Sequence, residues 1–165
     1  MVRLNTDRIN KTSPYQVKDT DKPGVLEFYT DHGVHYLVDF ILDDLIMSST
    51  VYQFGIANIN NVPSPRDEKV RETIITIIQN FFEENVKALL YICETGDGKQ
   101  SMRNRLFHSW FEKSGIREEI ALLSASIPDE EGIMNYATLM VPILSNDFEA
   151  VTKEFREIVS MFKSK

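Results

Sequence analysis

Two runs of alternating apolar residues, joined by a short loop that ends in glycine, constrain this chain more than any other feature. Leu26 and Phe28 alternate with polar residues in the first run, and Tyr36 and Val38 do so in the second. If residues 31–33 form the loop, with the glycine in the left-handed conformation, Phe28 lies opposite Tyr36 and the two apolar faces coincide. A loop one residue shorter would pair an apolar face with a polar one. The pattern therefore predicts an antiparallel hairpin.

Segments of strand and helix periodicity alternate along the rest of the chain. Their order, β-β-β-α-β-α-β-β-α, predicts an α+β fold with a single mixed, mainly antiparallel sheet and helices packed against it. Ser64 is the expected N-cap of the first long helix, and a short extra strand is expected at Tyr15. Beyond the hairpin, the predicted strands cover 51–57, 88–93, 120–127 and 134–143, and the predicted helices cover 64–82, 99–114 and a final segment from about Asn146. The expected apolar face of the second long helix consists of Met102, Leu106, Phe107, Trp110 and Phe111.

The composition describes a compact soluble protein. With 165 residues, of which 42% are hydrophobic, the chain can bury roughly 70% of the surface that its unfolded form exposes. Residues 1–13 are polar without a sustained period, so we expect a flexible N-terminal arm followed by a single α+β domain over 14–165. The single cysteine and the lack of a secretory signal or a membrane-length apolar run indicate a cytoplasmic protein.

The formal net charge is −7, so the chain as a whole repels polyanions. This acidic balance argues against nucleic acids and anionic membranes as partners. A local basic patch on the arm and on the second long helix is the one route left to nucleic-acid binding. The oligomeric state stays open, because an uncovered edge strand can pair with a second copy.

The stretch from Tyr91 to Phe111 combines a buried strand, a loop with two glycines and the beginning of a helix. Backbone N–H groups at a helix N-terminus, with cations nearby, favour an anionic group. The competing interpretation is that Thr95 or Asp97 merely caps the helix. The spacing matches neither a P-loop nor a dinucleotide fingerprint, so the anion is not defined further. The expected ligand-binding residues are Thr95, Gly96, Asp97, Gly98, Lys99, Arg103 and Arg105.

Two residues of the same stretch are candidates for catalysis. His108 shares a helix face with Arg105 and Glu112, so it could serve as a general acid or base. Cys93 ends the buried strand beside a helix N-terminus, where the pKa of a thiol can fall and a nucleophile can form. Surface ion pairing and core packing explain the same two positions without catalysis.

A second group of ligand-type side chains, His32, His35 and Asp39, lies on the hairpin. Only His35 and Asp39 point the same way, and at ~3.3 Å per residue they are about 13 Å apart, too far for one ion. We therefore expect no metal site and no cofactor.

The paired segments 28–31 and 36–40, followed by the run from Leu90 to Phe111, resemble a family of small bacterial proteins without an assigned activity. The resemblance covers most of the chain after residue 13. It implies a bacterial cytoplasmic protein and fixes no catalytic residue. Its most specific part is carried by Tyr91, Cys93, Asp97, Lys99, Gln100, Arg103, Asn104, Arg105, Phe107, Trp110 and Phe111.

The interpretation that these observations favour is a non-enzymatic binding or interaction protein. It would hold an anionic group, belonging to a small molecule or to a protein, at loop 94–99 and the helix that follows. The first alternative is an enzyme acting on a phosphorylated or nucleotide substrate, with His108 or Cys93 as the reactive group. The second alternative is a nucleic-acid accessory protein, which the net charge disfavours.

Overall fold

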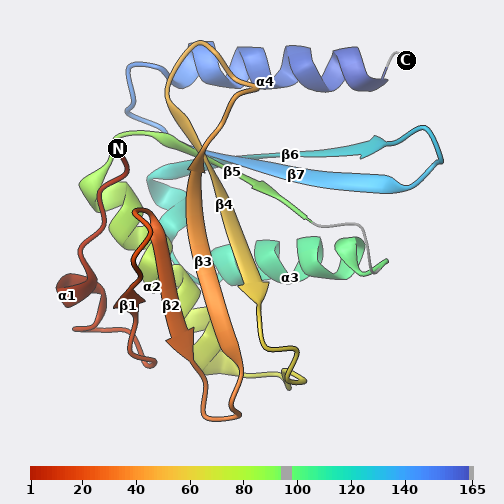
Figure 1. The fold of residues 1–165 in the computed structure, drawn as a ribbon. Helices are drawn as coiled ribbons and strands as arrows, with labels where there is room; N and C mark the ends of the chain where they lie inside the picture. Colours follow the sequence, from red (N-terminus) through yellow and green to blue (C-terminus); the bar gives the residue numbers. More distant parts are fainter. Residues whose placement is uncertain (94–97, 164–165) are drawn as a thin grey trace. The chain divides into compact units, whose positions relative to one another are not determined.

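The computed structural model describes residues 1–93 and 98–163. Its strands form one seven-stranded mixed sheet in the order β1-β2-β3-β4-β5-β7-β6 (Figure 1), which confirms the predicted α+β fold. The strands are β1 Lys18–Asp19, β2 Val25–Tyr29, β3 His35–Leu42, β4 Val51–Asn58, β5 Ala88–Ile92, β6 Ile120–Pro128 and β7 Met134–Pro142. The helices are α1 Thr6–Ile9, α2 Glu68–Glu84, α3 Gln100–Glu112 and α4 Phe148–Lys163, with a 3-10 turn η1 at Ile116–Glu118.

The predicted hairpin is confirmed in its register. Strands β2 and β3 pair antiparallel with Phe28 opposite Tyr36, and their rings stack with centroids 5.3 Å apart. Gly33 adopts a φ of 79°, the left-handed conformation that the three-residue loop needs. Phe28 is fully buried, so the loop aligns the two apolar faces on one core.

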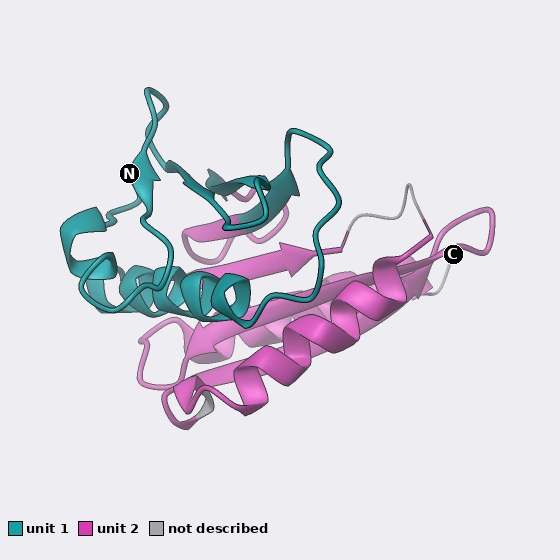
Figure 2. Cartoon of the chain, turned by 90° about the horizontal axis from the view of Figure 1, so that it is seen from below, with its two compact units in different colours: residues 1–41, 54–86 teal, residues 42–53, 87–165 magenta. Residues whose placement is uncertain are grey.

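The chain divides into two compact units, residues 1–41 with 54–86 and residues 42–53 with 87–165 (Figure 2). The first unit holds α1, α2 and the hairpin. Its core is aromatic: the Phe40 ring stacks on Phe81 at 5.2 Å, and Phe40 also contacts Phe54 at 5.4 Å. The expectation of a single domain over 14–165 stays a prediction.

The first residues of the chain make defined contacts within the first unit. Helix α1 buries Ile9 to 1% exposure. The N–H of Asn5 donates to Oδ1 of Asn80 at 2.9 Å, and the N–H of Arg3 donates to Oδ1 of Asn85 at 3.1 Å. The flexible arm expected over 1–13 concerns motion, which these contacts do not measure, so it stays a prediction.

In the second unit, α3 and α4 lie on opposite sides of β6 and β7 (Figure 1). Side chains of a strand alternate between its two faces. Leu90 and Leu139 pack with Phe155 of α4, whereas Tyr91, one residue along β5, stacks on Phe107 of α3 with ring centroids 4.1 Å apart. This alternation covers both faces, which explains the continuous apolar run of β5.

Helix α2 begins later than the sequence indicates, so the expectation that Ser64 is its N-cap is wrong. Asp67 is the N-cap, with a φ of −139°, and its carboxylate accepts the N–H of Lys69 at 3.0 Å. The other carboxylate oxygen accepts the hydroxyl of Tyr15. Ser64 instead hydrogen-bonds the hydroxyl of Tyr36 at 2.6 Å. Asp67 rather than Ser64 caps the helix because Tyr15, which lies outside the helix, also holds the Asp67 side chain.

Three other expectations need correction. The extra strand lies at β1, not at Tyr15, whose ring is buried. Helix α4 begins at Phe148 rather than Asn146. Met102 and Leu106 of α3, expected on its apolar face, are 55% and 50% exposed. The reason is geometric: α3 meets the sheet along the narrow stripe of Gln100, Phe107 and Phe111, and residues 102 and 106 lie outside it at 3.6 residues per turn.

Candidate functional site

The His108 imidazole lies against two hydroxyl groups of the sheet. Its Nε2 is 2.9 Å from Oγ of Ser124 on β6 and 3.0 Å from Oγ1 of Thr138 on β7. Thr138 is fully buried, whereas Ser124 is exposed. A serine hydroxyl at this distance from an imidazole has the spacing of a nucleophile and its base. Here the Thr138 hydroxyl competes with Ser124 for the same nitrogen. The two contacts also hold α3 against the sheet.

His108 was predicted from the sequence as a candidate, whereas Ser124 and Thr138 were not. The signal was available in β6, where the small polar residues Ser124 and Ser126 alternate with apolar ones. Because side chains alternate along a strand, both serines point to one face of the sheet, away from the side that α4 covers. What the sequence does not show is that this face lies beneath α3, because that depends on how distant elements pack.

The thiol of Cys93 is enclosed by protein. Its residue is 1% exposed, and burial raises the pKa of the thiol, against smaller lowering effects from Tyr91 and the charge of Arg103. A buried thiol with a raised pKa is a poor nucleophile. The geometry therefore gives no support to a catalytic Cys93, and the catalytic role of either residue stays a prediction.

The cationic residues expected to hold an anion are distributed around α3. Thr95, Gly96 and Asp97 lie outside the described residues. Gly98 has a φ of 72°, and Lys99 is exposed at the N-cap position. Arg103 is half-buried and close enough to Cys93 to influence its pKa, whereas Arg105 is exposed. Residues two apart on a helix point to different sides, so Arg103 and Arg105 do not meet, and Arg105 shares its side of α3 with His108.

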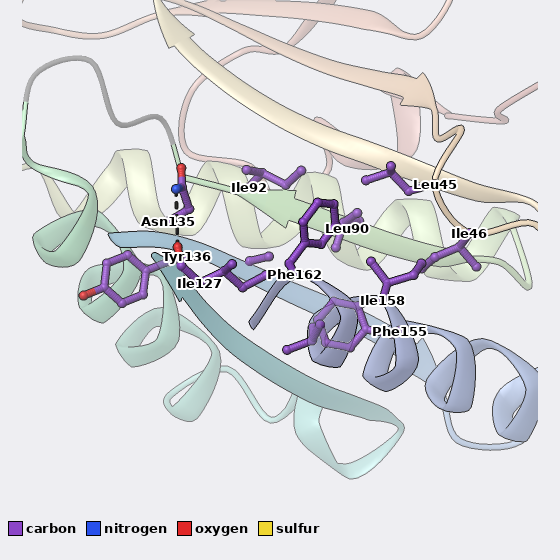
Figure 3. Close-up of a pocket in the computed structure, with 12 residues that line it drawn as sticks. Leu45, Ile46, Leu90, Ile92, Ile127, Asn135, Tyr136, Phe155, Ile158 and Phe162 are labelled. Atoms are coloured by element: carbon purple, nitrogen blue, oxygen red, sulfur yellow. Dashed lines mark hydrogen bonds between the residues drawn. The ribbon is translucent and has the colours of Figure 1, made fainter. Parts of the chain in front are cut away.

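An apolar pocket of about 130 Å³ lies on the opposite face of the same strands, beneath the C-terminal half of α4 (Figure 3). None of the described residues that line it is charged. Its mouth is marked by partly exposed apolar side chains, among them Phe162 at 47% and Ile92 at 42%. The lining residues are Leu45, Ile46, Leu90, Ile92, Ile127, Asn135, Tyr136, Ala137, Phe155, Ile158, Val159 and Phe162.

Asn135 supplies the amide at one end of this pocket (Figure 3). Its Nδ2 donates to the carbonyl oxygens of Ile127 and Ile133, each at 3.3 Å. These bonds hold the side chain at the turn between β6 and β7. The amide donors are thus used within the turn, and the surface that the pocket offers to a ligand is apolar.

A carboxylate of α4 holds the loop that forms one wall of the pocket. Glu154 accepts the N–H of Met47 at 2.6 Å and of Ser48 at 2.9 Å. Burial alone would raise the pKa of Glu154, but these hydrogen bonds outweigh it and hold the pKa below the ordinary 4.5. Leu45 and Ile46 line the pocket just before these two residues. Their own N–H groups donate to the Asp43 carboxylate at 3.1 and 2.8 Å, so Asp43 and Glu154 together hold this wall.

The outer face of the hairpin carries polar contacts rather than a cluster of ligands. Nε2 of His35 is 3.0 Å from the Glu27 carboxylate, and its ring stacks on Tyr29 at 4.1 Å. Burial raises the pKa of Asp39, against the hydrogen bonds it accepts from the backbone. Among the residues that the structure describes, no three His, Cys, Asp or Glu side chains gather to hold a metal ion.

These features define an α+β protein with one mixed sheet, an imidazole–hydroxyl cluster on one face and an apolar pocket on the other. The chain belongs to a family of unknown function, DUF6169, whose sequence model matches residues 66–157, more than half of the chain. The match confirms the resemblance to a family without an assigned activity. It includes α3 and seven of the twelve residues that line the pocket. Leu45 and Ile46 precede the matched range, and Ile158, Val159 and Phe162 follow it.

No curated protein matches the chain. Within residues 1–93 and 98–163, none of the helices combines the length and the apolar character needed to cross a bilayer. The two faces of the sheet therefore carry the features from which a function can be inferred.

Proposed function

We propose that this chain is a non-enzymatic binding protein that takes a small apolar ligand, or the apolar end of a larger one, in the pocket beneath α4. The single observation that carries this proposal is the uncharged, apolar lining of a concave site. Apolar surface left in contact with water is unfavourable by about 25 cal/mol per Å². A ligand that covers this surface gains that free energy.

The size of the pocket limits the ligand. A cavity of about 150 Å³ lined by aliphatic and aromatic side chains binds benzene, and this pocket is about 130 Å³. A single ring or a short alkyl chain therefore fits inside, with anything larger projecting past Phe162. A neutral ligand is favoured over an ion, because a charge inside this uncharged pocket would meet no countercharge.

A series of straight-chain alcohols from butanol to octanol tests the proposal. Binding is followed by the methyl NMR signals of Ile158 and Leu90, two residues that line the pocket. Each added methylene that enters the pocket contributes ~0.8 kcal/mol, so the affinity rises about fourfold per carbon. The increase should stop once the chain is longer than the pocket. A surface that binds alcohols nonspecifically would show no such break.

Two substitutions on α4 separate the pocket from the rest of the helix. Val159→Phe adds a ring inside the pocket and should abolish alcohol binding. Met161→Phe adds the same ring to a side chain that is 63% exposed and does not line the pocket, so binding should be retained. Equal binding by both variants, or none by the native chain, would overturn the proposal.

A second candidate function follows from the other face of the sheet, where α3 could hold an anionic group of a small molecule or a partner protein. The observation that favours it is that His108, held by Ser124 and Thr138, shares a side of α3 with the exposed Arg105. Thermal shift with inorganic phosphate tests it. Arg105→Gln should remove the shift, and Arg103→Gln, on another side of the helix, should keep it. The absence of a shift in the native chain would exclude this site.

We also propose that the protein acts in the bacterial cytoplasm. Its only cysteine, Cys93, is a buried free thiol, and free thiols persist in reducing compartments. Localisation of a tagged full-length chain, with a periplasmic marker as control, tests the proposal. Recovery in the periplasmic fraction would contradict it.

A further inference from the structure

A second pocket, of about 210 Å³, lies in the first unit between the N-terminal segment and α2. It differs from the pocket beneath α4 in being lined largely by polar and charged side chains. Arg8, Lys11 and Thr12 contribute from the N-terminal segment, and Gln79, Asn80 and Glu83 contribute from α2.

Asn80 carries the argument, because one of its two polar atoms is satisfied and the other is not. The residue is 3% exposed. Its Oδ1 accepts the N–H of Asn5 at 2.9 Å, which fixes the orientation of the amide. Its Nδ2 is buried and has no hydrogen-bond partner in the described chain. A buried donor without an acceptor costs about 1–3 kcal/mol, so such groups in native proteins usually mark a bound water or ligand.

The charges around the pocket indicate the charge of a group that could accept a hydrogen bond from Nδ2 of Asn80. Nε of Arg8 is 3.3 Å from Glu83, and a second guanidinium nitrogen lies 4.0 Å from Glu84, so this cation is neutralised by α2. Lys11 is exposed and forms no ion pair with the described part of the chain. Lys11, which has an uncompensated ammonium, and Asn80, which has an unused amide N–H, therefore both line this pocket.

We propose that this pocket binds the carboxylate of a small monoanion. One carboxylate oxygen accepts from Nδ2 of Asn80, and the other faces the ammonium of Lys11. A monoanion fits better than a dianion such as phosphate, because Glu83 also lines the pocket and repels additional negative charge. The proposal is independent of the apolar site, since the two pockets share no residue.

Titration with sodium acetate, monitored by the side-chain NH₂ signals of Asn80 in ¹⁵N-labelled full-length protein, tests the site. We expect a saturable shift of this pair of signals, with inorganic phosphate giving a weaker one. Lys11→Gln should weaken acetate binding severalfold. Lys18→Gln removes the same charge from β1, away from the pocket, and should leave the binding unchanged.

The variant Asn80→Asp tests the donor itself. An aspartate keeps the oxygen that accepts from Asn5 and replaces the N–H by a second oxygen, so acetate binding, followed by the backbone amide of Gln79, should fall at least tenfold. If this variant does not fold, Lys11→Gln and Lys18→Gln decide the question alone. An Asn80 signal that moves no more than remote amides do, or equal affinity of the two lysine variants, would show that water satisfies Nδ2 and would overturn the proposal.

Discussion

The carboxylate of Asp39 occupies the space that a side chain on Gly55 would need. A Cβ atom built on Gly55 would collide with Oδ1 of Asp39, and the backbone N–H of Gly55 donates to the same carboxylate. Gly55 lies in β4, where glycine is otherwise unfavourable because it packs no side chain. The close approach of the Asp39 carboxylate accounts for it.

Gly55→Ala should therefore destabilise the protein by about 1–3 kcal/mol, because the Asp39 side chain must leave its position and give up the hydrogen bond. Urea unfolding measures the loss as a lower midpoint with an unchanged slope. In the double variant Asp39→Ala/Gly55→Ala the collision is absent, so its loss should be smaller than the sum of the two single losses. Strict additivity would show that the two residues do not interact.

Asp39 also predicts a dependence of stability on pH. Burial raises its folded-state pKa above the ordinary 3.8, so its contribution to stability is fully present below pH 3.8 and is lost as the pH rises through the folded-state pKa. Asp39→Asn stays neutral at every pH. Urea midpoints measured from below pH 3.8 to neutral pH should move in favour of the variant as the pH rises. A constant difference would contradict the raised pKa.

The sequence predicted elements whose signals are local. The β2–β3 register follows from the apolar alternation together with the glycine at position 33, because a shift of one residue would expose Phe28. The start of α2 was missed because Asp67 is fixed by Tyr15, which lies 52 residues away in the chain. The predicted apolar face of α3 was too wide, because the sheet covers only a narrow stripe of this helix and leaves Met102 exposed to solvent.

The candidate sites were less predictable than the fold. The apolar face of α4, with Phe155 and Val159, was visible in the sequence. The pocket was not, because it forms where the side chains of different elements leave space between them, and the periodicity of one element does not show this. Its wall at Leu45 comes from a loop that Glu154 fixes from more than 100 residues away. His108 was identified by residue type, whereas Thr138 and Ser124 come from other elements of the second unit.

Cys93 should be nearly unreactive in the folded protein. At 1% exposure the thiol meets a reagent only when the structure opens, and burial raises its pKa so that less thiolate is present at a given pH. Reaction with a chromogenic disulfide at mildly alkaline pH should be slower than in urea by roughly two orders of magnitude or more. The urea sample gives the reference of one thiol per chain. A fast native reaction would revive Cys93 as a candidate nucleophile.

His108→Ala should destabilise the protein by about 1–3 kcal/mol, because it leaves the buried hydroxyl of Thr138 without the imidazole. Ser124→Ala removes an exposed hydroxyl and should change stability by less than about 0.5 kcal/mol. Urea unfolding of both variants measures the contrast. Adding Thr138→Val to His108→Ala should cost less than the sum of the two single losses. A loss for Ser124→Ala as large as that for His108→Ala would mean that Ser124, rather than Thr138, is the partner that matters.

Glu154→Gln should release the loop before β4 and weaken the pocket beneath α4. The neutral amide keeps one acceptor oxygen, so at least one of the N–H groups of Met47 and Ser48 loses its partner, and hydrogen exchange there should accelerate roughly tenfold.

Because the folded-state pKa of Glu154 lies below 4.5, its contribution to stability is fully present above pH 4.5 and is lost as the pH falls through the folded-state value. In the native chain, the protection of these two N–H groups relative to their intrinsic exchange rate should fall in the same way under acid conditions. Glu157→Gln is the matched control, since Glu157 is exposed on the same helix and only pairs with Lys153 at 4.0 Å. If both variants exchange alike and bind alcohols as the native chain does, Glu154 does not position the wall of the pocket.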